Sequence, residues 1–133
     1  MSSVYTFRAV MAQPIDAVRV RVEAALKAEG FGILTEIDVA ATFKAKLGID
    51  RPPYLILGAC NPGLANRALE IDPSIGALLP CNVVLRTSDD GSGTIVEIVD
   101  PIAALAIADA AGVAPIATEA AERLRRVLDA VGA

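Results

Sequence analysis

Apolar and polar residues alternate at the start of the chain and then change to a helical spacing. Between Val4 and Val10 the apolar residues fall on every second position, a period that predicts a strand. After Pro14, which suits the first turn of a helix, apolar residues recur at intervals of three or four until Gly30. They are Ile15, Val18, Val22 and Leu26. The pattern therefore predicts a strand and then an amphipathic helix that Gly30 ends in the left-handed conformation.

Four more strands are predicted further along. Their ranges are 31–38, with Ile33, Thr35 and Ile37 on one face, 54–58, 78–86 and 94–99. The segment 54–58 holds no charged residue, which is typical of a buried central strand. Pro80 cannot donate to a strand ladder, so it marks an edge, a bulge or a strand entrance. Residues 89–93, two aspartates followed by Gly-Ser-Gly, predict a hairpin turn between the last two strands.

The remaining apolar spacing predicts helices. Val39, Phe43 and Leu47 recur every fourth residue before Gly48 and predict a short helix, and a second short helix follows Asn61. From residue 113 onward an apolar stripe predicts a long terminal helix, whereas the spacing in 102–111 is ambiguous. The stripe comprises Ala117, Ala120, Leu124, Val127 and Leu128.

These elements predict an α+β fold with two layers, a curved and mostly antiparallel sheet with helices on one face. The other face of such a sheet needs a dimer partner, a bound ligand or a polar surface.

Composition narrows the class of protein. The 133 residues suggest a single domain, 1–133, and 54% are hydrophobic, which is not a disordered composition. Trp is absent, and only five residues are Phe or Tyr. The net charge is −4. Because nucleic acids and anionic membranes attract positive charge, and single strands also stack on aromatic side chains, we expect binding to neither. Met1 is followed by a strand-like run instead of a signal sequence, so we expect a cytoplasmic protein with two free thiols. The absence of His removes His-based nucleophilic catalysis and the commonest metal ligand.

Three segments carry a resemblance to a known family. They are residues 30–39 (GFGILTEIDV), 54–62 (YLILGACNP) and 76–84 (GALLPCNVV). Together they resemble the domain-of-unknown-function 302 family of small bacterial and archaeal proteins. The resemblance implies a TATA-binding-protein-like β-α-β(4)-α fold, here with extra short helices, and a homodimer. It implies no DNA binding, because a fold does not fix a function, and no catalytic roles.

Two cysteines mark the first candidate site. Cys60 and Cys81 each lie at a predicted strand end and each precedes an asparagine. One interpretation is a redox pair, a persulfide carrier or a soft-metal site; the other is two buried cysteines that pack as small apolar residues. Two sulfurs alone cannot complete a tetrahedral zinc site.

A second polar cluster, Glu36, Asp38, Lys44 and Lys46, could bind a charged ligand or form a solvated surface. The candidate ligand-binding residues are Cys60, Asn61, Cys81, Asn82, Tyr54, Lys46 and Glu36. The sequence leaves the cofactor unknown and points to no catalytic residue or metal ligand. Its favoured hypothesis is a homodimeric, non-enzymatic module that binds a small ligand or a partner protein. The alternative is a thiol-dependent protein that uses Cys60 and Cys81 in redox, sulfur-carrier or soft-metal chemistry.

Overall fold

The computed structural model describes residues 4–132. Met1 to Ser3, on which the expected absence of a signal sequence partly depends, and Ala133 lie outside the described residues. Five strands, five α-helices and two short 3-10 helices make up this part of the chain. The strands are β1 (Thr6–Met11), β2 (Gly32–Asp38), β3 (Tyr54–Cys60), β4 (Cys81–Thr87) and β5 (Thr94–Val99). The helices are α1 (Ile15–Ala28), α2 (Val39–Leu47), α3 (Pro62–Ile71), η1 (Pro73–Leu78), α4 (Pro101–Leu105), η2 (Ala106–Ala108) and α5 (Val113–Gly132).

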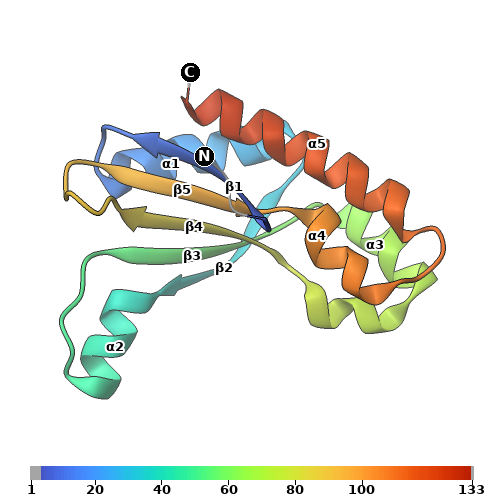
Figure 1. Cartoon of the computed structure of the whole chain (residues 1–133), viewed down its shortest axis with the longest axis horizontal. Helices are drawn as coiled ribbons and strands as arrows, with labels where there is room; N and C mark the ends of the chain where they lie inside the picture. Colours follow the sequence, from blue (N-terminus) through green and yellow to red (C-terminus); the bar gives the residue numbers. More distant parts are fainter. Residues whose placement is uncertain (1–3, 133) are drawn as a thin grey trace.

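All neighbouring strands of the sheet are antiparallel, in the order β1-β5-β4-β3-β2. Helices α1 and α5 lie side by side on one face of it (Figure 1). The predicted α+β class, the single helical layer over the sheet and the element order β-α-β(4)-α are confirmed. The likeness to TATA-binding protein stays a prediction.

Two hydrophobic clusters hold these elements together. The larger cluster lies between the sheet and the helices α1 and α5, and includes Phe7, Val22, Leu57, Val83 and Leu124. The smaller one joins α3, η1, α4 and the first half of α5, and includes Leu64, Ile75, Leu105, Val113 and Ile116. The second cluster builds the end of the molecule at which β3 finishes and β4 begins (Figure 1).

The residues predicted to end or cap helices do so in the structure. Gly30 and Gly48 follow α1 and α2 with φ values of +82° and +66°, a region in which side chains are strained. The Asn61 side chain accepts a hydrogen bond from the Leu64 amide and so caps α3. The segment 102–111, whose apolar spacing is ambiguous, contains most of α4 and all of η2.

Strand β2 differs from the prediction on one point. The register shifts between Ile33 and Thr35, so that Ile33 lies opposite the buried Ala59 while Thr35 lies opposite Gly58. Ile33 therefore packs towards the helix layer, and Thr35 and Ile37 share the other face. The prediction that all three share a face was wrong, because the irregularity at Leu34 changes the alternation of side chains. Strand β4 is also shorter than predicted, since η1 takes up residues 73–78.

Helix α2 is the least packed part of the fold. It lies below the sheet in Figure 1, away from α1 and α5, and none of its nine residues is buried. Leu47 is 62% exposed, although it belongs to the predicted apolar stripe. The periodicity thus predicts the helix correctly, but the contacts of α2 with β2 and β3 leave its stripe residues Val39 and Phe43 only half-buried.

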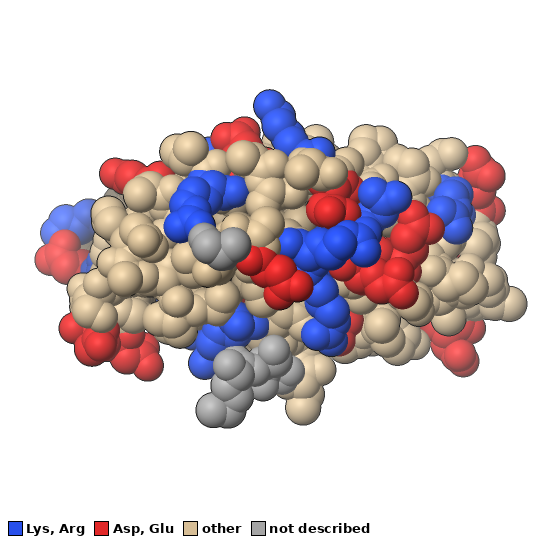
Figure 2. All heavy atoms as spheres, turned by 90° about the horizontal axis from the view of Figure 1, so that it is seen from above, with Lys and Arg blue, Asp and Glu red and all other residues tan. Residues whose placement is uncertain are grey.

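The outer surface of the helix layer carries mixed charges. Figure 2 shows Lys and Arg side chains interspersed with Asp and Glu over this face. Arg126 pairs with Glu29 at 3.0 Å and Arg123 with Glu119 at 3.2 Å. Among residues 4–132, no helix is both long enough and apolar enough to cross a membrane.

Candidate functional site

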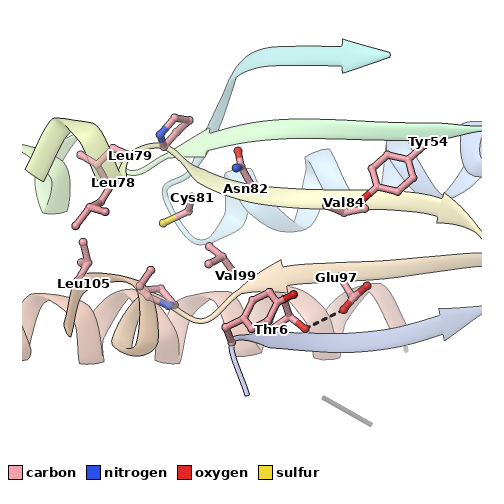
Figure 3. Close-up of a pocket in the computed structure, with 14 residues that line it drawn as sticks. Thr6, Tyr54, Leu78, Leu79, Cys81, Asn82, Val84, Glu97, Val99 and Leu105 are labelled. Carbon is pink, nitrogen blue, oxygen red and sulfur yellow. Dashed lines mark hydrogen bonds between the residues drawn. The ribbon is translucent and has the colours of Figure 1, made fainter. Parts of the chain in front are cut away.

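A pocket of about 310 Å³ lies on the face of the sheet that α1 and α5 leave uncovered (Figure 3). We call it the open-face pocket. Strands β1, β5, β4 and β3 form its floor, and η1 and α4 form its wall. Its lining comprises Tyr5, Thr6, Tyr54, Leu78, Leu79, Pro80, Cys81, Asn82, Val84, Glu97, Val99, Pro101, Ala104 and Leu105. The size is at the lower end of the range for small-molecule sites.

The two ends of the open-face pocket differ in chemistry. Leu78, Leu79 and Leu105 line one end, where the second hydrophobic cluster begins. Tyr54 and Glu97 line the other, with the Tyr54 ring directed across Val84 (Figure 3). The Tyr54 hydroxyl has no hydrogen-bond partner in the part of the chain that the structure describes. A mostly apolar lining with a few polar groups is the usual form of a binding pocket.

Glu97 is held in place by three neighbouring side chains. Its Oε2 accepts hydrogen bonds from Thr6 Oγ1 at 2.8 Å and Arg8 Nη2 at 3.2 Å. Its Oε1 accepts two from Arg86, at 2.9 Å from Nη2 and 3.3 Å from Nε. Burial raises the pKa of Glu97, but the hydrogen bonds from Arg86, Thr6 and Arg8 outweigh it and the net pKa is lowered. The group is therefore a fixed carboxylate at neutral pH.

Sequence reasoning missed this network. Glu97 is a lone charge within the apolar strand β5, a weak signal that a partner is required. Its partners are set by the strand register. On β1, Arg8 lies directly opposite Glu97; on β4, Val84 lies opposite Glu97, and Arg86 comes two residues later. A single sequence does not contain that register.

The fold brings the two cysteines to the same end of the sheet. Cys81 lies opposite Ala59, the residue before Cys60. Both half-buried thiols line a smaller cavity of about 40 Å³, and Cys81 also lines the open-face pocket. Burial raises the pKa of Cys60, and burial together with the neighbouring Cys60 raises the pKa of Cys81 to about 11. Both groups are therefore neutral thiols at neutral pH.

The other candidate residues fall into two groups. Tyr54 and Asn82 line the open-face pocket, and Asn61 lines the smaller cavity while it caps α3. Glu36 and Lys46 line neither space.

Glu36 lies on the helix side of β2, where it accepts a hydrogen bond from Arg19 Nε at 2.9 Å. Lys46 is exposed on α2, whose Lys44 pairs with Asp50 at 2.9 Å. Five of the seven candidates thus line the open-face pocket or the smaller cavity, and Glu36 and Lys46 lie apart from both. Within residues 4–132, no group of three or more Cys, Asp and Glu side chains is arranged to hold a metal ion.

Comparison with known proteins gives a consistent result. The model of the family described as "Domain of unknown function DUF302" matches residues 7–131. The chain is similar to the crystal structure of an uncharacterized conserved protein DUF302 from Bacillus stearothermophilus, with a TM-score of 0.88 and 28% identity over 97% of this chain and 99% of that one. A search of curated proteins found no match. With the family's segments at β2, β3 and β4 and its model matched along nearly the whole chain, this protein belongs to the DUF302 family.

Proposed function

We propose that the protein is a homodimeric binding module that holds a small, largely apolar ligand in the open-face pocket. The observation that carries this proposal is the pocket itself, about 310 Å³ on an uncovered sheet face, with a mostly apolar lining and a few polar groups that include Tyr54, Asn82 and Glu97. The proposal assigns no reaction to the protein. Glu97 has hydrogen-bond donors on both oxygens and a lowered pKa, which makes it a poor general base.

The homodimer is supported by the exposure of α2 and β2. A nine-residue helix with no buried side chain is too short to be stable in water without packing. Next to it, Leu34 is 66% and Ile37 49% exposed on the edge strand. Edge strands that expose apolar side chains are open to pairing with another chain. A second copy of the protein that covers this region would bury the exposed apolar side chains of both α2 and β2.

The thiol-dependent alternative stays a prediction with less support. A thiolate, not a thiol, is the nucleophile and the metal ligand, and burial raises the pKa of both cysteines. Because both thiols line an apolar cavity, the interpretation as small apolar residues fits their surroundings better.

An uncharged fluorescent dye tests the binding function. Wild-type protein is titrated with N-phenylnaphthylamine, beside Val84→Lys, which puts a charge on the pocket floor. The matched control is Val10→Lys, which places the same charge on the same sheet face outside the pocket, at a residue 67% exposed. We expect wild type and Val10→Lys to bind alike, and Val84→Lys to bind about tenfold more weakly. No binding by wild type, or equal binding by all three folded proteins, would overturn the proposal.

A further inference from the structure

The strand residues of the open sheet face carry more positive than negative charge, although the whole chain has a net charge of −4. Successive residues of a strand point to opposite faces, and residues such as Phe7 and Leu85 point towards the helices. Among the strand residues that point the other way, only Arg8, Arg86 and Glu97 are charged. Two guanidinium groups and one carboxylate leave a net charge of +1 on this face.

The hydrogen bonds within the chain occupy the acceptors of this charged group but not all of its donors. Thr6, Arg8 and Arg86 already donate four hydrogen bonds to the two Glu97 oxygens. Arg8 contributes only one of them, through Nη2, although a guanidinium group has five N–H donors. Its Nε is the one buried side-chain nitrogen or oxygen of residues 4–132 without a hydrogen-bond partner. Arg8, whose side chain is 34% exposed, therefore keeps donors for a bound anion.

Arg8 lies at the edge of the open-face pocket. Two of its neighbours line the pocket, namely Thr6, two residues earlier on β1, and Glu97, whose Oε2 is 3.2 Å from Arg8 Nη2. Figure 3 shows the hydrogen bond between Thr6 and Glu97 at this edge, with Leu78 and Leu105 at the far end of the pocket. A ligand that fills the pocket therefore has one end beside Arg8 and the other among leucines.

Charges from other elements keep this balance. The guanidinium carbon of Arg51 lies 5.6 Å from the centre of the Tyr54 ring, which lines the pocket, and adds a third cation. Asp89 lies 3.8 Å from Arg86 Nη1 but is 98% exposed, so solvent screens its charge. Asp100, which caps α4, places a negative charge towards the leucine end. An anionic group is therefore favoured at the Arg8 end and disfavoured at the other.

From this charge distribution, we infer that the ligand is an amphipathic anion, an apolar body with a single carboxylate. The carboxylate binds Arg8 beside Glu97, since the planar guanidinium group matches the two oxygens of a carboxylate. The apolar body lies over Val84 and Val99 and extends towards Leu105. This inference rests on the proposed binding function and adds the chemical class of the polar end of the ligand.

Three compounds with the same body test the charge. They are phenylbutyrate, phenylbutyramide and phenylbutylamine, which are anionic, neutral and cationic at neutral pH. Displacement of N-phenylnaphthylamine from wild-type protein measures the affinity of each. We expect the carboxylate to bind about tenfold more tightly than the amide, the usual effect of a charge-assisted hydrogen bond, and the amine to bind most weakly. An increase in NaCl of about tenfold should weaken the carboxylate and leave the amide unchanged, because salt screens charge.

Variants of Arg8 test where the carboxylate binds. Arg8→Gln should bind phenylbutyrate about tenfold more weakly and phenylbutyramide as tightly as wild type does. Arg8→Lys keeps the charge and should keep most of the preference for phenylbutyrate. The control is Lys27→Gln, which removes the same charge from an exposed site on α1, across the sheet from the pocket, and should behave as wild type. If Arg8→Gln does not fold, the head-group and salt comparisons in wild-type protein still decide the inference.

The outcomes separate this inference from the proposal on which it rests. An amide or amine that binds at least as tightly as the carboxylate would overturn the inference, and so would an equal loss of carboxylate and amide in Arg8→Gln. If none of the three compounds displaces the dye while dye binding still depends on Val84, the ligand class is wrong and the binding function stands. If the dye does not bind either, the proposed function itself fails.

Discussion

Arg86 donates two hydrogen bonds to a single carboxylate oxygen of Glu97, at 2.9 Å from Nη2 and 3.3 Å from Nε. Both side chains are largely buried, so the loss of either leaves a charge with fewer partners in a poorly solvated place. We therefore predict that Glu97→Gln lowers the free energy of unfolding by about 2 kcal/mol. Urea denaturation of wild type and variant measures this value. A change within error of zero would show that the network contributes no stability.

The same residue predicts a pH dependence. The pKa of Glu97 is lowered in the folded protein, so its contribution to stability is present above the unfolded value, near 4.5, and is lost as the pH falls through the folded value. Stability should therefore decline below about pH 4.5, and Glu97→Gln should decline less steeply over that window. Glu122→Gln, at an exposed position on α5, should keep the wild-type slope. Parallel slopes for wild type and Glu97→Gln would contradict this assignment.

Gly58 permits a close approach at the rim of the pocket. A Cβ atom there would overlap Thr35 Oγ1 and lie 2.8 Å from Pro80 Cγ. We expect Gly58→Ala to lower the free energy of unfolding by about 1–3 kcal/mol and to displace Pro80. Gly32→Ala on the adjacent strand is the control, because its Cβ would meet no atom within 4 Å. Equal thermal midpoints for the two variants would refute the steric argument.

The exposed side chains of α2 make the dimer testable. We predict that Leu47→Glu, which puts a charge on this helix, converts the proposed dimer into a monomer of 13.7 kDa. Val20→Glu places the same charge at a 68% exposed position on α1 and should leave the dimer intact. Light scattering after size-exclusion chromatography reports the mass. A wild-type protein that elutes as a monomer would remove the homodimer from the proposal.

The thiols should be slow to react in the folded protein. Since the pKa of Cys81 rises from an ordinary 9.0 to about 11, its thiolate fraction at neutral pH is about a hundredfold below that of an exposed cysteine. A thiol reagent should label Cys60 first and Cys81 much later, and both should react quickly in urea. Rapid labelling of Cys81 in the native state would restore the thiol-dependent alternative.

Much of the fold could be predicted because its signals are local. The turns of α1 and α2 end at Gly30 and Gly48, Asn61 caps α3, and strand β5 has the predicted bounds. Each of these depends on residues within a few positions along the chain. The face taken by Ile33 depends on a bulge opposite β3, which no local pattern reveals.

The candidate site was predictable only in part for a similar reason. The sequence analysis names Cys81, Asn82 and Tyr54 because they lie in distinctive segments, and in the structure they line the open-face pocket. Glu97 was missed because its partners come from β1 and β4, at positions that only strand pairing brings near. Glu36 and Lys46 lie elsewhere, because β2 directs Glu36 towards α1 and Lys46 is exposed on α2.

In the described chain, α5 is the one helix with buried side chains in both hydrophobic clusters, through Ile116 and Ala120 in one and Leu124 and Val127 in the other. The helices that form the wall of the pocket therefore cannot unfold independently of the sheet that forms its floor. Unfolding of either part would have to displace α5, which packs against both. Unfolding should accordingly occur as one cooperative transition, and a ligand that orders the pocket end should protect amide hydrogens along the whole of α5 against exchange with solvent.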